Sequence, residues 1–228
     1  MIDYLYMRHY TYDLLRRVFI EEPSLDLLTY LQNEGNLDVL GLSDNMNAST
    51  APLVDQIKLY LSEKTFKQGE FDYENLHWDY TRLFIGPEAP PAPPWESFYT
   101  DDKLLFQQTT QDVKKVYTQN GYALGKHEFE AADHIGFELD FMYHLSGKCI
   151  DAIEENEETL EHSPPYLNTL ETQHSFLHNH LLAFTDQFSK NVSEHSDTAF
   201  YKSFALLLST FLKHDETVIN QYIRGILS

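Results

Sequence analysis

Apolar residues recur every three to four positions along most of the chain, which is the spacing expected of helices with one buried face. The first such stripe lies within residues 3 to 20, and Ser24 is well placed to cap a second helix. We expect a third helix to follow Pro52 and a fourth to stop at Gly86, because proline and glycine both break helices. The first part of the chain is therefore predicted to be helical.

The same spacing continues in the rest of the chain. It predicts a helix within residues 103 to 120, ended by a left-handed Gly121, and another within residues 133 to 154, with Asp133 as its N-terminal cap. Further helices are predicted through residues 166 to 188, 197 to 213 and 215 to 226. Together these elements predict an all-α fold, a single globular multi-helix bundle of eight or nine helices that forms one domain over residues 1 to 228.

One stretch interrupts the helical pattern. The sequence "RLFIGPEAPPAPPWESFY", residues 82 to 99, holds five of the nine prolines beside four aromatic residues. Proline removes backbone donors and blocks helix formation, so we expect a stiff loop at about residues 85 to 99. Its large aromatic side chains cannot all enter a regular core, which makes the loop either a rigid strap or a docking surface.

Composition indicates an ordinary soluble protein of a reducing compartment. Hydrophobic residues make up 42% of the chain, which is enough to fill a core. The single cysteine, Cys149, excludes an internal disulfide and any multi-cysteine metal site within one chain. We find no secretory signal, and no apolar run approaches the roughly 18 residues that a membrane span needs. We therefore expect a cytoplasmic protein without a membrane span.

The chain is also strongly acidic. It has 36 acidic against 16 basic residues, which gives a formal net charge of −20. This charge argues against a nucleic-acid partner, because phosphate contacts need clustered lysine and arginine. It would attract a cationic partner, although many soluble proteins are acidic for solubility alone. Net charge by itself therefore selects no partner.

Patterns of catalytic or metal centres are sparse. No serine lies in a Gly-x-Ser-x-Gly elbow, and Cys149 lies in an apolar helical stripe where a core role is expected. Two Glu-x-x-His pairs have the spacing used by di-iron helical bundles, namely Glu74 with His77 and Glu171 with His174. Because such pairs also arise by chance in a chain with 11 histidines, we predict no catalytic residue, metal or cofactor. A di-iron enzyme is the alternative from a different class.

A second polar cluster lies at the start of a predicted helix. The segment "EAADHIGFELDFM" gathers four ionisable groups, Glu130, Asp133, His134 and Glu138. Capping by Asp133 and a pair between His134 and Glu138 would explain the cluster locally. Beside the aromatic loop, these carboxylates would instead complete a receptor for a peptide that is both apolar and cationic. We expect the two segments to form one site.

These two segments carry a family resemblance. "YTRLFIGPEAPPAPPWESFY" together with "EAADHIGFELDFM" resembles the TorD/DmsD family of redox-enzyme maturation chaperones, and the similarity continues through "FLHNHLLAFTDQF" and "AFYKSFALLLSTFL". It covers most of residues 73 to 212. The resemblance implies an all-α cytoplasmic chaperone that is not an enzyme and binds the twin-arginine signal peptide of a molybdopterin-containing reductase of the DMSO or TMAO reductase type. Such a chaperone holds the precursor until the cofactor is inserted and before export, as a monomer or a domain-swapped homodimer.

The resemblance also implies a set of signal-peptide-binding residues. These are Tyr80, Leu83, Phe84, Pro94, Trp95 and Ser97 from the first segment, and Glu130, Asp133 and His134 from the second. Trp95 and Phe84 would bury the apolar part of the peptide. Glu130 and Asp133 would bind its arginines through charge-assisted hydrogen bonds, and His134 would orient a carboxylate.

Two positions depart from the family pattern. Ala131 stands where the family often has proline, and Phe184 stands where it often has tryptophan. Neither change removes a charged contact, but both leave the subgroup open. An assembly factor for a molybdoenzyme of the nitrate reductase type is therefore the alternative within the family.

Overall fold

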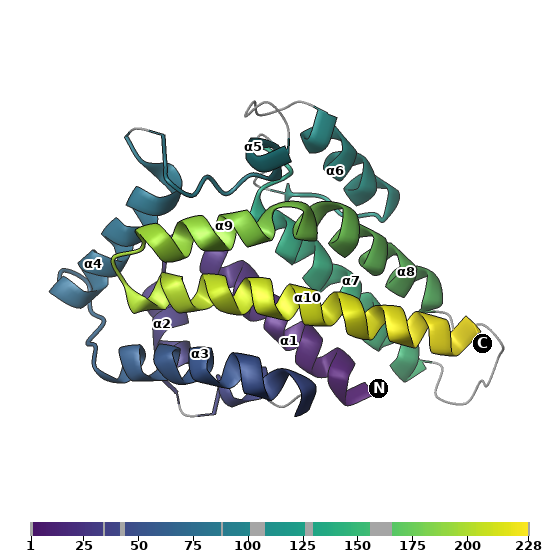
Figure 1. Cartoon of the computed structure of the whole chain (residues 1–228), viewed down its shortest axis with the longest axis horizontal. Helices are drawn as coiled ribbons and strands as arrows, with labels where there is room; N and C mark the ends of the chain where they lie inside the picture. The colour runs from purple at the N-terminus through teal and green to yellow at the C-terminus, as the bar shows by residue number, and fades with distance from the viewer. Residues whose placement is uncertain are drawn as a thin grey trace.

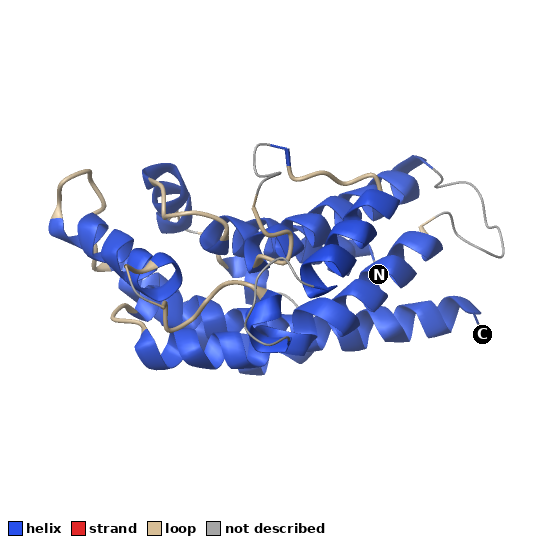
Figure 2. Cartoon of the chain, turned by 90° about the horizontal axis from the view of Figure 1, so that it is seen from above, coloured by secondary structure: helices blue, strands red, loops and turns tan. Residues whose placement is uncertain are grey.

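Helices account for the regular secondary structure in the described part of this protein (Figure 1, Figure 2). The computed structural model describes residues 2–33, 35–41, 44–87, 89–100, 108–125, 130–155 and 166–227. Within these ranges, extended pairing is limited to one isolated β-bridge. The predicted all-α fold is confirmed.

Most of the helices are α-helical. Their bounds are α1 (Ile2–Phe19), α2 (Leu25–Gln32), α3 (Asp44–Ser62), α4 (Phe71–Tyr80), α5 (Glu96–Thr100), α6 (Gln108–Gln119), α7 (Ile135–Glu155), α8 (Leu167–Phe176), α9 (Leu182–His195) and α10 (Ala199–Leu227). A 3₁₀ turn, η1 (Asp38–Gly41), precedes α3, and two π-helical turns are η2 (Thr81–Ile85) and η4 (Leu177–Leu181). The turn η2 prolongs α4, whereas η4 joins α8 directly to α9. Ser24 caps α2 as predicted, since its hydroxyl accepts a hydrogen bond from the Leu27 N–H at 3.1 Å.

The helices pack around one continuous core. The long helix α10 lies across the molecule with α9 and α3 beside it, while α1 packs mainly against α7 (Figure 1). The core draws side chains from α1 to α4 and from α6 to α10, and its members include Leu15, Leu139, Phe188 and Phe204. These are the apolar stripes that the sequence spacing predicts. None of the described helices combines the length and the apolarity needed to cross a membrane.

A buried charge pair ties three helices together inside this core. Arg8 of α1 and Asp215 of α10 are both fully buried, and 2.7 Å separates Arg8 Nε from the Asp215 carboxylate. Tyr12 donates its hydroxyl to the same carboxylate at 2.6 Å, and Arg8 also donates to Gln173 of α8. Removing one partner of such a pair typically costs about 3–5 kcal/mol. The cluster therefore holds α1 against α8 and α10.

Two helix boundaries differ from the predictions. The helix α3 begins at Asp44, so Pro52 lies inside the helix rather than before it. Proline has a helix-compatible φ, and η1 and α10 pack against α3, so tertiary contacts offset the lost backbone hydrogen bond. The helices predicted at 197 to 213 and 215 to 226 form the single helix α10, because no glycine or proline lies between them.

The predicted helix at 103 to 120 corresponds to α6. Its described part starts at Gln108, and residues 103 to 107 lie outside the described residues. Gly121 follows this helix with a φ of +69°, which confirms the predicted left-handed end.

The proline-rich segment runs from η2 to α5. Gly86 leaves the π-helical turn with a φ of +54°, and its N–H donates to the Thr81 carbonyl at 2.7 Å. The second half of the segment packs against the body of the protein, since Ala92 and Pro94 are buried. The irregular stretch is shorter than the predicted loop at 85 to 99. Pro94 is the last proline of the segment, Trp95 follows it, and the helix α5 begins at the next residue, Glu96.

Candidate functional site

The two segments singled out in the sequence pair with each other through their backbones. The Ile135 N–H donates to the Pro94 carbonyl at 2.8 Å, and the Glu96 N–H donates to the Asp133 carbonyl at 2.9 Å. These bonds form an antiparallel bridge between Trp95 and His134, whose rings also meet edge to face at 6.0 Å. The proline-rich segment is thereby fixed to the start of α7.

Asp133 strengthens this junction from inside. Its carboxylate accepts hydrogen bonds from the Ser97 N–H at 2.9 Å and the Thr110 hydroxyl at 2.8 Å, and its side chain is fully buried. The prediction that Asp133 caps its own helix is wrong, because α7 begins later and His134 precedes its first residue. Asp133 instead caps α5, and the Gly136 N–H donates to His134 Nδ1 at 3.1 Å.

A cleft of about 700 Å³ opens beside this junction. It is lined by Ile20, Glu21, Glu22, Pro23, Ser24, Tyr73, His77, Tyr80, Phe84, Ile85, Pro94, Trp95, Glu130 and His134. The lining therefore comes from the α1–α2 turn, from α4 with η2, from the proline-rich segment and from the residues before α7. Six of the nine residues predicted for the site line this cleft, whereas Leu83, Ser97 and Asp133 are fully buried outside its lining.

Aromatic side chains form the apolar part of the cleft. Tyr80 and Phe84 are almost completely buried, and their rings meet edge to face at 5.0 Å. Phe84 also contacts Phe19 and Phe188, so this surface is anchored in the core. Phe84 belongs to the π-helical turn η2, a kind of turn that is frequent at functional sites. Trp95 is half-buried and adds a further aromatic wall.

Carboxylates supply the polar part of the same cleft. Glu21 and Glu22 lie in the turn between α1 and α2, and Glu130 lies before α7. A distance of 3.2 Å separates Glu22 Oε2 from His77 Nε2 on α4. Of these three glutamates, Glu130 was predicted from the sequence, whereas Glu21 and Glu22 were not. The only indication of these two residues in the sequence is that they form an acidic pair directly before Pro23. The sequence alone does not show that this turn lies beside α4.

Comparison with known proteins assigns the chain to a family. Residues 41–190 match the model of a family described as nitrate reductase delta subunit. A TorD chaperone of Photobacterium profundum is 30% identical over 152 residues, covering 66% of this chain and 67% of its own length. The chain belongs to the TorD/DmsD family of redox-enzyme maturation chaperones.

Three further proteins, two relatives by sequence and one solved structure, match different shares of this TorD/DmsD-family chain. A TorD chaperone of Vibrio cholerae is 26% identical over 212 residues, which is 92% of this chain and 90% of that protein. A probable Tat proofreading chaperone DmsD of Haemophilus influenzae is 30% identical over 59% of this chain and 57% of its own. A putative redox enzyme maturation protein from Archaeoglobus fulgidus aligns in structure over 91% of this chain and 93% of its own, with a TM-score of 0.48 and 21% identity. The curated relatives are named as chaperones, in agreement with the prediction that the chain is not an enzyme.

A buried acidic pair lies behind the cleft of this TorD/DmsD-family chain. Glu96 of α5 and Glu138 of α7 are almost fully buried, and His180 Nδ1 lies 3.0 Å from Glu96 Oε2. Burial, followed by the charges of Glu96 and Asp133, raises the pKa of Glu138 well above its ordinary range. Neither oxygen of Glu138 has a donor among the described side chains, so a proton on Glu138, donated to Glu96, satisfies the pair. The predicted pair between His134 and Glu138 is not formed.

The metal and nucleophile candidates have other partners. His77 lies beside Glu22, and His174 Nε2 lies 3.1 Å from Glu216, so the two Glu-x-x-His pairs do not converge on one centre. Among the described residues, no group of three or more possible ligands gathers around a common point. Cys149 is fully buried, and burial raises the pKa of its thiol to about 11, which confirms its predicted core position.

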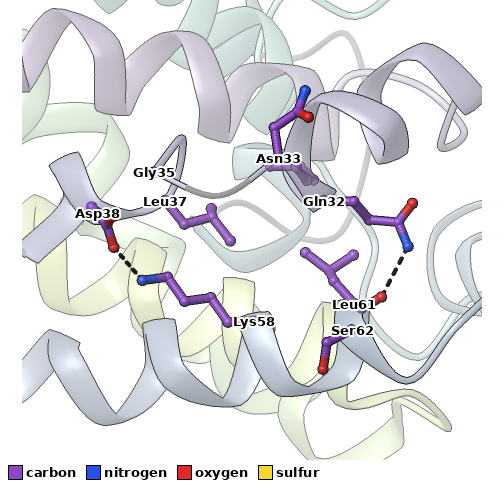
Figure 3. A pocket seen from close by; sticks show the side chains of 9 residues that line it. Gln32, Asn33, Gly35, Leu37, Asp38, Lys58, Leu61 and Ser62 are labelled. Atoms are coloured by element: carbon purple, nitrogen blue, oxygen red, sulfur yellow. Dashed lines mark hydrogen bonds and ion pairs between the residues drawn. The ribbon is translucent and has the colours of Figure 1, made fainter.

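A second pocket, of about 470 Å³, lies between α2, η1 and α3 (Figure 3). Asp38 and Lys58 form an ion pair at its edge, and Gln32 Nε2 donates to the Leu61 carbonyl at 2.9 Å. None of the described residues that line it is aromatic. Among the described lining residues the one carboxylate, Asp38, already has a cationic partner, so this pocket is less suited than the cleft to an apolar and cationic peptide.

Proposed function

We propose that this TorD/DmsD-family chain is a cytoplasmic maturation chaperone for a molybdopterin-containing reductase, whose twin-arginine signal peptide it binds in the cleft. The observation that carries the proposal is the cleft itself, where an aromatic surface and three carboxylates adjoin. A twin-arginine signal combines two guanidinium groups with an apolar segment, and these match the two parts of the cleft. Holding this peptide would keep the precursor from export until its cofactor is inserted.

For the client we propose a reductase of the DMSO or TMAO reductase type. The similarity to a TorD chaperone over 92% of the chain supports this choice. A nitrate-reductase-type client is the alternative, and the description of the matching family model, nitrate reductase delta subunit, favours it. Calorimetric titration with synthetic signal peptides of the three reductase types would separate them, since the client's peptide should bind at least about tenfold more tightly, or 1.4 kcal/mol.

Replacement of the cleft tryptophan tests the binding site. Trp95→Ala should weaken binding of the preferred peptide by about thirtyfold or more, because truncating a central aromatic anchor often costs about 2 kcal/mol. Trp78→Ala is the matched control, since Trp78 is 68% exposed on α4 and does not line the cleft. Equal effects of the two substitutions, or no binding of any twin-arginine peptide by the unmodified protein, would contradict the proposed function.

A further inference from the structure

The burial of Asp133 changes which carboxylates can receive a peptide arginine. Asp133 is completely buried, and both of its oxygens already accept hydrogen bonds, from Ser97 and Thr110. A guanidinium group reaching it would have to displace the cap of α5. Asp133 therefore positions the junction rather than contacting a ligand in the cleft.

The carboxylates that line the cleft are those of Glu21, Glu22 and Glu130. The first two are adjacent, and the turn that carries them is anchored on both sides. The Ile20 N–H continues the hydrogen bonding of α1 by donating to Arg16 at 2.8 Å, and Ser24 caps α2. A short turn held in this way presents two neighbouring negative charges without a large loss of backbone freedom on binding.

Tyr80 provides an independent indication of a ligand at the same place. Its side chain is only 4% exposed and lines the cleft, yet its hydroxyl has no hydrogen-bond partner in the described part of the chain. Burial first, and then the charges of Glu22, Glu21 and Glu130, raise the pKa of this hydroxyl. It therefore stays protonated at neutral pH, where it can accept a hydrogen bond from a guanidinium group and donate one to a carboxylate.

We propose that Glu21, Glu22 and the Tyr80 hydroxyl form the guanidinium-binding subsite of the cleft and bind the arginine pair of the signal peptide. This inference rests on the proposed function and assigns the arginines to the α1–α2 turn. Glu22 already contacts His77 at 3.2 Å and the Thr81 hydroxyl at 3.5 Å. An incoming arginine either displaces these two groups from Glu22 or binds the carboxylate beside them. The apolar residues of the peptide then lie over Phe84 and Trp95, in the aromatic part of the same cleft.

The test compares two pairs of adjacent glutamates. The double substitution Glu21→Gln, Glu22→Gln should weaken binding of the twin-arginine peptide by about tenfold or more. Removing one partner of a hydrogen-bonded charge pair between protein and ligand typically lowers the affinity at least that much. Glu154→Gln with Glu155→Gln, at the exposed end of α7, makes the same change in net charge away from the cleft and should leave the affinity within about twofold. Tyr80→Phe keeps the buried ring and should weaken binding severalfold, with unchanged circular dichroism.

A peptide with two lysines in place of the arginines completes the experiment. The unmodified protein should prefer arginine, because only guanidinium pairs with carboxylates in a bidentate fork. That preference should shrink in the Glu21→Gln, Glu22→Gln variant. If this variant binds like the Glu154→Gln, Glu155→Gln control while Trp95→Ala loses binding, the subsite assignment is overturned and the proposed function stands. If the unmodified protein binds no twin-arginine peptide, both are overturned.

Discussion

At the scale of single residues, the protonation of Glu138 links the stability of the fold to pH. This side chain is fully buried against Glu96, with Asp133 nearby, and His180 contacts Glu96. Its pKa is raised in the folded chain, so the folded state keeps a proton that the unfolded state loses once the pH exceeds the ordinary range of a glutamate. The stabilising contribution of this proton is complete at acidic pH and is lost as the pH rises through the raised pKa.

Glu138→Gln should therefore flatten the pH dependence of stability. The amide is neutral at every pH and can still donate to Glu96, so the variant should be more stable than the unmodified protein at pH 8, by on the order of 1 kcal/mol, with a smaller difference at pH 5. Chemical denaturation at the two pH values measures this. Glu63→Gln, the same Glu-to-Gln exchange at an exposed position, should leave the pH dependence as it is. A slope for Glu138→Gln equal to that of Glu63→Gln would refute the shared proton.

At the scale of secondary-structure elements, the short helix α5 depends on a cap from outside its own segment. Five residues are too few for a helix to be stable alone. Its first turn is instead held by the Asp133 carbonyl and carboxylate, which accept from the N–H groups of Glu96 and Ser97. The position of Trp95, directly before α5, follows from this cap.

Asp133→Ala should accordingly weaken peptide binding although Asp133 does not line the cleft. Loss of a helix cap typically costs about 0.5–2 kcal/mol, and here the loss would release α5 and the Trp95 wall together. Hydrogen exchange of the Ser97 amide should accelerate, while the amides of α10 keep their protection. Thr110→Val, which removes one of the two donors to Asp133 and leaves the carboxylate in place, should have a smaller effect. Unchanged exchange at Ser97 in the Asp133→Ala variant would show that α5 does not need this cap.

The extent to which these elements are predictable follows from the range of the interactions that form them. Helical stripes and the cap of α2 depend on residues a few positions apart, so spacing alone predicted them. Asp133 is a residue type that often caps the helix directly after it. Its carboxylate instead accepts a hydrogen bond from the Ser97 N–H, 36 residues earlier in the chain. From the sequence, Glu21 and Glu22 are expected only to mark the end of the first helix. The packing of the α1–α2 turn beside α4 brings them to the cleft.

At the scale of the whole molecule, the net charge of −20 acts on an approaching cationic peptide before contact. Such attraction mainly raises the rate of association and is screened by salt, because the Debye length falls from about 10 Å at 0.1 M to about 3 Å at 1 M. The association rate constant of a twin-arginine peptide should therefore fall by about tenfold or more between 0.05 M and 0.5 M salt. Stopped-flow tryptophan fluorescence would measure it, and a rate independent of salt would contradict a role for long-range charge.

The buried pair of Arg8 and Asp215 has a consequence for the way the chain acquires its structure during synthesis. The two residues are 207 positions apart, so α1 leaves the ribosome long before the carboxylate that neutralises Arg8 exists. Until then, Arg8 has no charge partner and is better solvated by water than buried in a core. We therefore expect the core around α1 to close only after α10 has been made, and nascent chains that stop before α10 to be sensitive to proteases.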